Sequence, residues 1–352
     1  MKVAIIGLHQ SGKTTVFKSL VGAVASPKNS HGQGIHVGNV KVPDNRLDRL
    51  VEIFNPPKIV HADIDFMDMA GARPDEKGTG LTPQVIIEMR SADAIVAVVR
   101  AFNNPSVPHP LDTIDPLRDM KNIEAELNVT DMIQIENRLQ RMARERSDTM
   151  EKEALLKAKE CLDAEKPLRL LDMNETEIRI LTGFHFLSRK PLLLLLNISE
   201  QDIGKPPGKE LTDFAERNDC SLMPYCAEVE LEISELQPDE QAGFLVEMGL
   251  HDSGKDRFVR KVYEMLRLIS FFTAGETEVH AWSVAKGIRA INAAGKVHSD
   301  MERGFIRAEI INFEDFVKIG SMQAARESGH LRLEGKDYEV CDGDMVVFRF
   351  NV

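Results

Sequence analysis

Glycine, lysine and hydroxyl residues near the N-terminus have a spacing that can bind phosphate. The stretch GLHQSGKTT fits the pattern G-x-x-x-x-G-K-[ST] and lies between an apolar strand pattern and a helical pattern. Glycine permits a tight path that turns successive backbone N–H groups toward one anion, and the lysine can reach the β- and γ-phosphates. The next hydroxyl can bind magnesium. We therefore predict a nucleotide-phosphate site at these residues: Gly7, Gln10, Ser11, Gly12, Lys13, Thr14 and Thr15.

A second motif, D-x-x-G, follows the apolar run DIDFM. A magnesium-bound triphosphate needs a carboxylate near the metal, and Asp68 can hold the metal through water. The N–H of Gly71 can sense the γ-phosphate and couple it to the flexible segment ARPDEKGTG. A surface aspartate in a turn would match the motif equally well, but its place after a strand favours the metal site. We predict Thr14 and Asp68 as metal residues, and Lys13 and Gly71 as catalytic residues.

The leucine run LLLLLNISE raises the question of base selectivity. Guanine-specific proteins of this design carry N-K-x-D, in which lysine packs beneath the ring and aspartate accepts hydrogen bonds from N1 and N2. Here Asn197 is followed by Ile198 and then by Glu200, a longer carboxylate, and adenine offers only its N6 amino group on that edge. The segment predicts loss of the guanine clamp, with Cys226 and Ala227 in a second base-binding loop. A GTPase that uses Glu200 in place of aspartate is the alternative.

Four apolar runs must position these side chains: KVAIIG, HADIDFMDMAG, ADAIVAVV and KPLLLLLN. They alternate with helical patterns, which predicts an α/β fold with a mostly parallel sheet and helices on its faces. Ligands bind beyond the carboxyl ends of such strands, where Asp68 and Asn197 fall. We predict a P-loop NTPase domain over residues 1–114 and 183–270.

Residues 115–182 interrupt this pattern with a long charged stretch. Apolar residues recur in it at spacings of three and four, before and after the polar sequence RERSDT: Met132, Ile135, Leu139 and Met142, then Leu155, Ala158 and Leu162. The spacing predicts two helices that fold back as an inserted coiled-coil hairpin. Two ordinary amphipathic helices packed on the core are the alternative.

The pattern changes again from about Phe271, where short alternating strands begin and Asp342 and Gly343 mark a turn. We predict a small β domain over residues 271–352. Its basic residues, with Trp282 and Phe305 among them, fit an RNA-facing surface, because phosphates need fixed cations and bases stack on exposed rings. They are Lys286, Arg289, Lys296, Arg303 and Arg307. Interleaved acidic residues fit ordinary solvated charge as well.

The composition limits the class of protein. The 352 residues, 43% of them hydrophobic, suffice for two or more domains, and a net charge of -12 argues against a nucleic-acid coat or an anionic membrane as the main partner. The four cysteines lack C-x-x-C spacing, and no apolar stretch approaches the ~20 residues of a membrane span. We expect a soluble, cytoplasmic protein without a membrane partner, and a monomer because no further seam is evident.

Together these residues resemble the YchF-type Obg-like ATPases of the P-loop GTPase superfamily. Further matching stretches are VKVPDNRLDRL, DPLRDMKNIEAEL, FFTAGETEVHAWSVAKG and AAGKVHSDMERGFIRAEII, so that the resemblance runs nearly end to end. It implies a GTPase-like domain with a helical coiled-coil insertion and a C-terminal TGS-type β-grasp domain. It also implies Mg²⁺-dependent hydrolysis of ATP in preference to GTP, and association with ribosomes. RNA contact would then involve the β domain and the hairpin, whose Arg141, Arg144 and Arg146 lie near the tip.

The sequence departs from the family at two places in the phosphate site. The family P-loop reads G-x-P-N-x-G-K-S, whereas here His9, Gln10 and Thr14 replace the proline, asparagine and serine. The asparagine is linked to potassium-assisted hydrolysis, so Gln10 puts potassium activation in doubt. The segment in which the family has a magnesium-binding threonine reads NSHGQGIHVGNV and contains none. Its glycines predict a mobile loop: Gly32, Gly34 and Gly38.

The resemblance also implies how the attacking water is handled. The family has an apolar residue after D-x-x-G, as Ala72 is here, and a histidine from a later loop is thought to act instead. His109 in FNNPSVPHPLD stands at the matching position, and a neutral imidazole could position a water or take its proton. An exposed loop histidine is the alternative.

Two hypotheses of different classes follow. The first is a slow Mg²⁺-dependent ATPase associated with ribosomes. The second is a nucleotide-gated ribosome- or RNA-binding module with little turnover, which the missing threonine and Gln10 favour. Hydrolysis of GTP remains a third possibility.

Overall fold

The computed structural model describes residues 1–22, 35–69, 81–145, 149–248, 250 and 252–351. Its contacts divide the chain into two compact units. Unit 1 comprises residues 1–40 and 65–258, and unit 2 comprises residues 41–64 and 259–352. The predicted boundaries assigned residues 41–64 to the NTPase domain. They group with unit 2 because β3 (Lys58–Val60) pairs in parallel with β9 (Glu278–Ala285).

Unit 1 contains a six-stranded sheet in the order β2-β4-β1-β5-β6-β7. The bounds of its strands are β1 (Lys2–Ile6), β2 (His36–Lys41), β4 (Asp63–Asp68), β5 (Ala94–Arg100), β6 (Leu192–Asn197) and β7 (Ser221–Tyr225). Strand β1 pairs in parallel with β4 and β5, and β5, β6 and β7 continue in parallel. The predicted α/β class with a mostly parallel sheet is confirmed.

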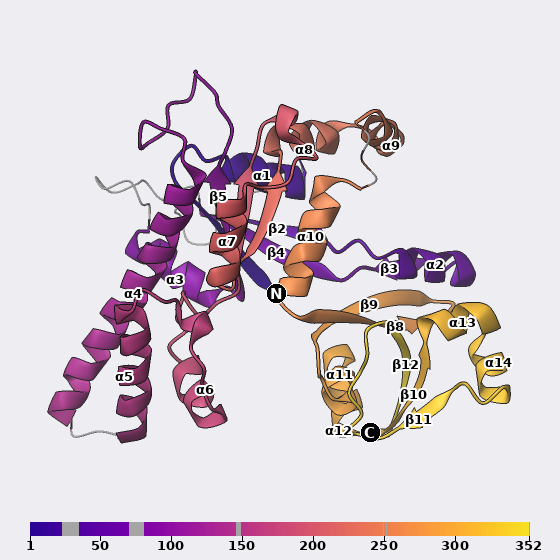
Figure 1. Ribbon diagram of the computed structural model, residues 1–352. Helices are drawn as coiled ribbons and strands as arrows, with labels where there is room; N and C mark the ends of the chain where they lie inside the picture. The colour runs from indigo at the N-terminus through magenta and orange to yellow at the C-terminus, as the bar shows by residue number, and fades with distance from the viewer. Residues whose placement is uncertain (23–34, 70–80, 146–148, 249, 251, 352) are drawn as a thin grey trace. The chain divides into compact units, whose positions relative to one another are not determined.

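Helices cover both faces of this sheet (Figure 1). The helices of this part of the chain are α1 (Lys13–Val21), α3 (Pro83–Ser91), α7 (Lys209–Arg217), α8 (Ala227–Glu235) and α10 (Gly254–Met265), and α9 (Pro238–Glu247) packs on α8. Ala4 and Ile6 of β1 pack in one core cluster with Val85 of α3 and Phe214 of α7. Because both faces are buried, strands such as β5 and β6 are apolar up to their last residues, Arg100 and Asn197.

Gly38 corrects one prediction, because it lies within β2 and not in a mobile loop. A Cβ atom at Gly38 would meet Cγ2 of Val21 at 2.3 Å and Cζ of Phe17 at 3.0 Å. The glycine therefore allows β2 to pack closely on α1. Gly32 and Gly34 lie outside the described residues.

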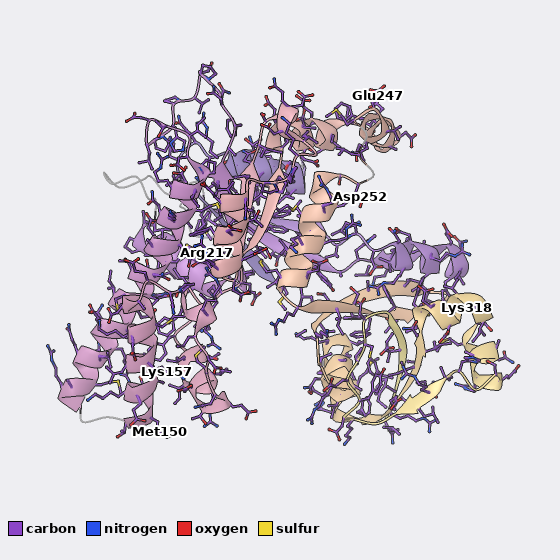
Figure 2. The ribbon with its side chains drawn as sticks, in the orientation of Figure 1. Met150, Lys157, Arg217, Glu247, Asp252 and Lys318 are labelled. Atoms are coloured by element: carbon purple, nitrogen blue, oxygen red, sulfur yellow. The ribbon has the colours of Figure 1, made fainter. Side chains whose placement is uncertain are left out.

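The predicted helical insertion is confirmed as α4 (Pro116–Glu145), α5 (Thr149–Asp163) and the shorter α6 (Glu175–Thr182), with a 3-10 turn at Leu168–Leu170. The first half of α4 packs on the sheet, and its second half lies beside α5 around the predicted apolar residues (Figure 1). Lys157 of α5, labelled in Figure 2, pairs with Glu177 of α6 at 2.9 Å. The insertion is thus both a sheet-covering helix and a hairpin.

Unit 2 contains a second six-stranded sheet in the order β11-β10-β12-β8-β9-β3. Its other elements are α2 (Asn45–Phe54), β8 (Leu268–Ala274), α11 (Ala290–Val297), α12 (Ser299–Arg303), β10 (Phe305–Asn312), α13 (Phe313–Ile319), α14 (Met322–Glu327), β11 (Arg332–Glu334) and β12 (Asp344–Phe350). Gly343 has φ 83° in the predicted turn before β12. This mixed sheet packed against α11 agrees with the expected β-grasp module. In the described part of the chain, no helix is long and apolar enough to cross a membrane.

Candidate nucleotide-binding site

The loop between β1 and α1 requires glycine at two positions. Gly7 has φ 147°, and a Cβ atom there would meet the Val98 carbonyl oxygen at 2.4 Å. Gly12 has φ 95°, and its Cβ would meet Nδ2 of Asn197 at 2.3 Å. Both the backbone angle and the lack of space exclude other residues, as a loop that presents its N–H groups to an anion requires.

Lys13 begins α1 and folds back over the loop. Its Nζ donates hydrogen bonds to the carbonyl oxygens of Gly7 at 2.9 Å and Leu8 at 2.8 Å. Burial lowers the pKa of Lys13 to about 8, although the charge of Asp68 opposes the shift. The ammonium group is therefore held among carbonyl groups at the site where a phosphate would stabilise its charge.

Thr14 and Asp68 meet at the expected metal position. The Thr14 hydroxyl donates to Oδ2 of Asp68 at 3.2 Å, and Asp68 is fully buried at the end of β4. A hydroxyl and a carboxylate are hard oxygen donors of the kind that magnesium prefers. The buried Ser11 hydroxyl has no hydrogen-bond partner among the described residues. The residues present therefore fit a magnesium-bound triphosphate.

Asn197 explains why a leucine strand ends on an amide. Its Nδ2 donates to the Ser11 carbonyl oxygen at 3.0 Å, and its Oδ1 accepts from the Ala227 N–H at 3.1 Å. The buried side chain thus ties the phosphate loop to the N-terminus of α8. Both polar atoms of the amide therefore bond to protein groups.

The other predicted base-binding residues lie around the same end of the sheet. Ile198 packs on a cluster that includes Cys226, the residue before α8. Burial, together with the nearby carboxylates of Glu228 and Glu200, raises the pKa of the Cys226 thiol. Glu200 is exposed and begins a 3-10 turn, Glu200–Asp202. An apolar side chain, a neutral thiol and an exposed carboxylate therefore line this region.

His109 is buried, which differs from the exposed loop histidine that the sequence left open. Its Nδ1 accepts a hydrogen bond from the Leu111 N–H at 3.1 Å, so the proton lies on Nε2, which donates to Oδ2 of Asp119 at 3.0 Å. Asp119 is itself buried and pairs with Arg118. The bonds of His109 thus lead into α4 and not to the phosphate loop.

Arg100 is a positioning residue that the sequence analysis missed. It ends β5, and its buried guanidinium donates to carbonyl oxygens at several points of the following loop: Phe102, Asn104, Val107 and Pro108. The guanidinium also lies 4.6 Å from the centre of the Phe102 ring. The signal was available, because a charged residue at the end of an apolar strand needs partners nearby.

Three further predictions concern the loops. Gly71 and Ala72 lie outside the described residues, as does the first half of the segment that lacks threonine. Gln10 has φ 60°, in the left-handed region where asparagine is several-fold enriched. The family's asparagine is thus better suited to this backbone than Gln10 is.

A glycine loop between a parallel strand and a helix, with its lysine, hydroxyl and carboxylate together, defines a P-loop NTPase of the GTPase type. A family model described as "50S ribosome-binding GTPase" matches residues 2–138. The C-terminal YchF-GTPase model, described as a protein of unknown function, matches residues 268–351. The chain belongs to the YchF family, because full-length relatives exceed one-third identity.

The relatives include proteins named "Ribosome-binding ATPase YchF". That of Bacillus subtilis (strain 168) is 39% identical, with 100% of both chains covered. That of Escherichia coli O157:H7 is 36% identical over 100% of this chain and 99% of its own. The solved YchF GTPase of Schizosaccharomyces pombe is 28% identical, with a TM-score of 0.88, and covers 99% of this chain and 97% of its own.

Proposed function

We propose that the protein is a slow Mg²⁺-dependent nucleotide hydrolase that prefers ATP to GTP and acts on the ribosome. The observation that carries the proposal is the Thr14–Asp68 hydrogen bond beside the buried Lys13. These are the groups that positioning and charge neutralisation of a triphosphate require. The names of the relatives support ribosome binding and ATP.

A bound magnesium triphosphate would supply the reacting γ-phosphoryl group and an in-line leaving group. Lys13 would exchange its carbonyl partners for phosphate oxygens, while the loop N–H groups bind the other phosphates. Thr14 would bind the metal directly, and Asp68 would hold it through water. The Gly71 N–H would sense the γ-phosphate.

The preference for ATP would come from the residues after β6. Ile198 would cover the base, and the longer side chain of Glu200 would place its carboxylate differently from the aspartate that accepts from both N1 and N2 of guanine. Cys226 and Ala227 would form the facing loop, with Asn197 fixing the distance between this loop and the phosphates. A GTPase remains the alternative reading of Glu200.

His109 is the proposed residue for the attacking water. Its Nε2 proton is donated to Asp119, and its Nδ1 lone pair accepts from the Leu111 N–H, so Nδ1 would have to leave Leu111 before it could take a proton from water. This arrangement favours a second candidate function, a nucleotide-gated ribosome-binding module with little turnover. We further propose a monomer in the cytoplasm, with potassium activation in doubt because of Gln10.

Calorimetric titration of nucleotide-free protein with ATP and GTP, with magnesium, tests the nucleotide preference. We expect ATP to bind at least about tenfold more tightly, a difference of ~1.4 kcal/mol, and Glu200→Asp to reduce that difference. Tighter binding of GTP would reject the ATPase. Turnover on ribosomes then separates the two functions: loss in His109→Ala, with ATP affinity kept, supports the enzyme, whereas no wild-type turnover supports the binding module.

A further inference from the structure

Three arginines meet one buried glutamate on a sheet face of unit 2. Nη2 of Arg326 lies 2.7 Å from Oε2 of Glu309, and Nη2 of Arg349 lies 3.0 Å from the same oxygen. Nη2 of Arg307 lies 3.6 Å from Oε1 of Glu309. The arginines come from α14, β12 and β10, and we call the three side chains the arginine patch.

The strand register places two of these cations directly opposite each other. Arg307 pairs with Arg349 across the antiparallel β10–β12 ladder, and Glu309 pairs with Val347 two positions along. Like charges at directly opposed positions destabilise a sheet. Glu309 offsets part of that repulsion, but a single carboxylate cannot neutralise three guanidinium groups.

The patch therefore carries excess positive charge in a place that solvent can reach. The Glu309 side chain is only 4% exposed, whereas those of Arg307, Arg326 and Arg349 are 50%, 60% and 49% exposed. Arg349 lowers the pKa of Glu309, so the carboxylate is ionised and the patch has a net charge of about +2. Each guanidinium has five N–H donors, and most of them remain for an external acceptor.

Two other basic residues of unit 2 are arranged differently. Arg289 pairs with Asp337, and Arg303 pairs with Asp300, so each is matched by one exposed carboxylate. Phe305, expected as a stacking ring, is buried in the core, and Trp282 already stacks on His280 at 3.6 Å. Arg307 is the member of the predicted RNA-facing set that belongs to the arginine patch, where it is joined by two arginines that the sequence analysis did not include.

We propose that the arginine patch binds the phosphodiester backbone of RNA. The inference rests on the proposed function, because it names the surface through which the protein would contact the ribosome. Guanidinium groups bind phosphate oxygens through two parallel N–H donors, and Glu309 fixes them in place before binding. Docking to RNA would offset the repulsion between Arg307 and Arg349.

An acidic protein is a weaker match to the same surface. Protein interfaces are organised around apolar and aromatic anchors with charges at the rim. Here the cations come from β10, β12 and α14, and the large exposed apolar side chains near them are single residues on three strands: Leu333 of β11, Ile306 of β10 and Phe350 of β12. The surface therefore suits charge-driven contact with a backbone, without selection of base sequence.

Fluorescence anisotropy of a labelled 20-nucleotide oligouridylate, titrated with the full chain, tests the proposal. The patch variant combines Arg307→Gln, Arg326→Gln and Arg349→Gln. The control variant combines Arg289→Gln, Lys296→Gln and Lys318→Gln; Lys318, on α13, is labelled in Figure 2. Both variants remove three positive charges. We expect roughly tenfold to hundredfold weaker binding and a salt slope smaller by about 2 for the patch variant alone.

Glu309→Gln changes the net charge of the patch in the opposite direction, because it removes the one negative charge among the three arginines. We expect it to keep or increase RNA affinity while it lowers the melting temperature. Equal losses in the patch and control variants, or loss of affinity in Glu309→Gln with its fold kept, would overturn the proposal. So would a patch variant that loses ribosome cosedimentation but binds oligouridylate normally, since its partner would then be protein. Failure of the wild type to sediment with ribosomes would instead contradict the proposed function.

Discussion

The buried position of Lys13 lowers the stability of the nucleotide-free fold but suits phosphate binding. Its ammonium is buried among carbonyl groups, and burial lowers its pKa to about 8 from 10.5. The folded protein therefore carries a charged group that would be better solvated in the unfolded chain. The penalty is present in full below pH 8 and is relieved as the pH rises from 8 toward 10.5, where the folded protein has lost the proton that the unfolded chain keeps.

Lys13→Met should consequently stabilise the nucleotide-free protein at pH 7, by up to about 3 kcal/mol, and this advantage should shrink by pH 10. ATP binding should be lost in the same variant, because the phosphate partner is gone. Thermal unfolding of both proteins across pH 6–10 measures the difference, in which the other titrating groups largely cancel. A variant that is less stable than wild type at pH 7 would contradict this account of Lys13.

Arg169 shows how one side chain can connect several elements. From the 3-10 turn after α5, its guanidinium pairs with the buried Glu124 of α4 and donates to the Asn218 carbonyl oxygen at 2.6 Å. It also donates to Sγ of Cys220 at 3.1 Å, while burial raises the pKa of that thiol to about 12. The ion pair thus joins two parts of the insertion, and the hydrogen bonds to Asn218 and Cys220 connect it to the residues before β7.

Removal of one partner should leave an uncompensated charge in the interior. We expect Arg169→Ala to reduce the free energy of unfolding by about 3–5 kcal/mol. The double variant Arg169→Met, Glu124→Leu should recover most of that loss, because both charges leave together. Urea unfolding with unchanged m-values provides the comparison. A double variant as unstable as the single one would mean that the carbonyl contacts of Arg169 matter more than its ion pair.

At the scale of the whole molecule, residues 41–64 link two parts of the chain that are distant in sequence. Phe54 of α2 stacks on Phe316 at 5.6 Å, and β3 pairs with β9. A chain cut after residue 266 lacks these partners. We expect trypsin to cleave at Arg49 or Lys58 at least about tenfold faster in that chain than in the full one, since local opening controls proteolysis. Cleavage at Arg144 serves as the control. If truncation left the cleavage rates at Arg49 and Lys58 as unchanged as the rate at Arg144, the grouping of residues 41–64 with unit 2 would be contradicted.

Local patterns sufficed for the strands, the phosphate loop and the helical insertion, because glycine spacing and apolar periodicity act over a few residues. They did not reveal the burial of His109, because that burial depends on a hydrogen bond to Asp119, a residue of the following helix α4. The arginine patch was not predicted either, because its members come from β10, β12 and α14, which lie side by side only in the folded unit 2. The assignment of residues 41–64 failed for a similar reason: the pairing partner of β3 lies in the last quarter of the chain.

The pairing of β3 with β9 also forms late during synthesis, because β9 is translated long after β3. Translation at about 5–20 residues per second releases Lys58–Val60 roughly 10–40 seconds before the strand that completes its hydrogen bonds. For that time the nascent chain carries a strand edge open to unwanted pairing. A length of three residues and a terminal lysine are features that make such an edge a poor template for other chains. The short length of β3 thus reduces unwanted strand pairing by the nascent chain until β9 has been synthesised.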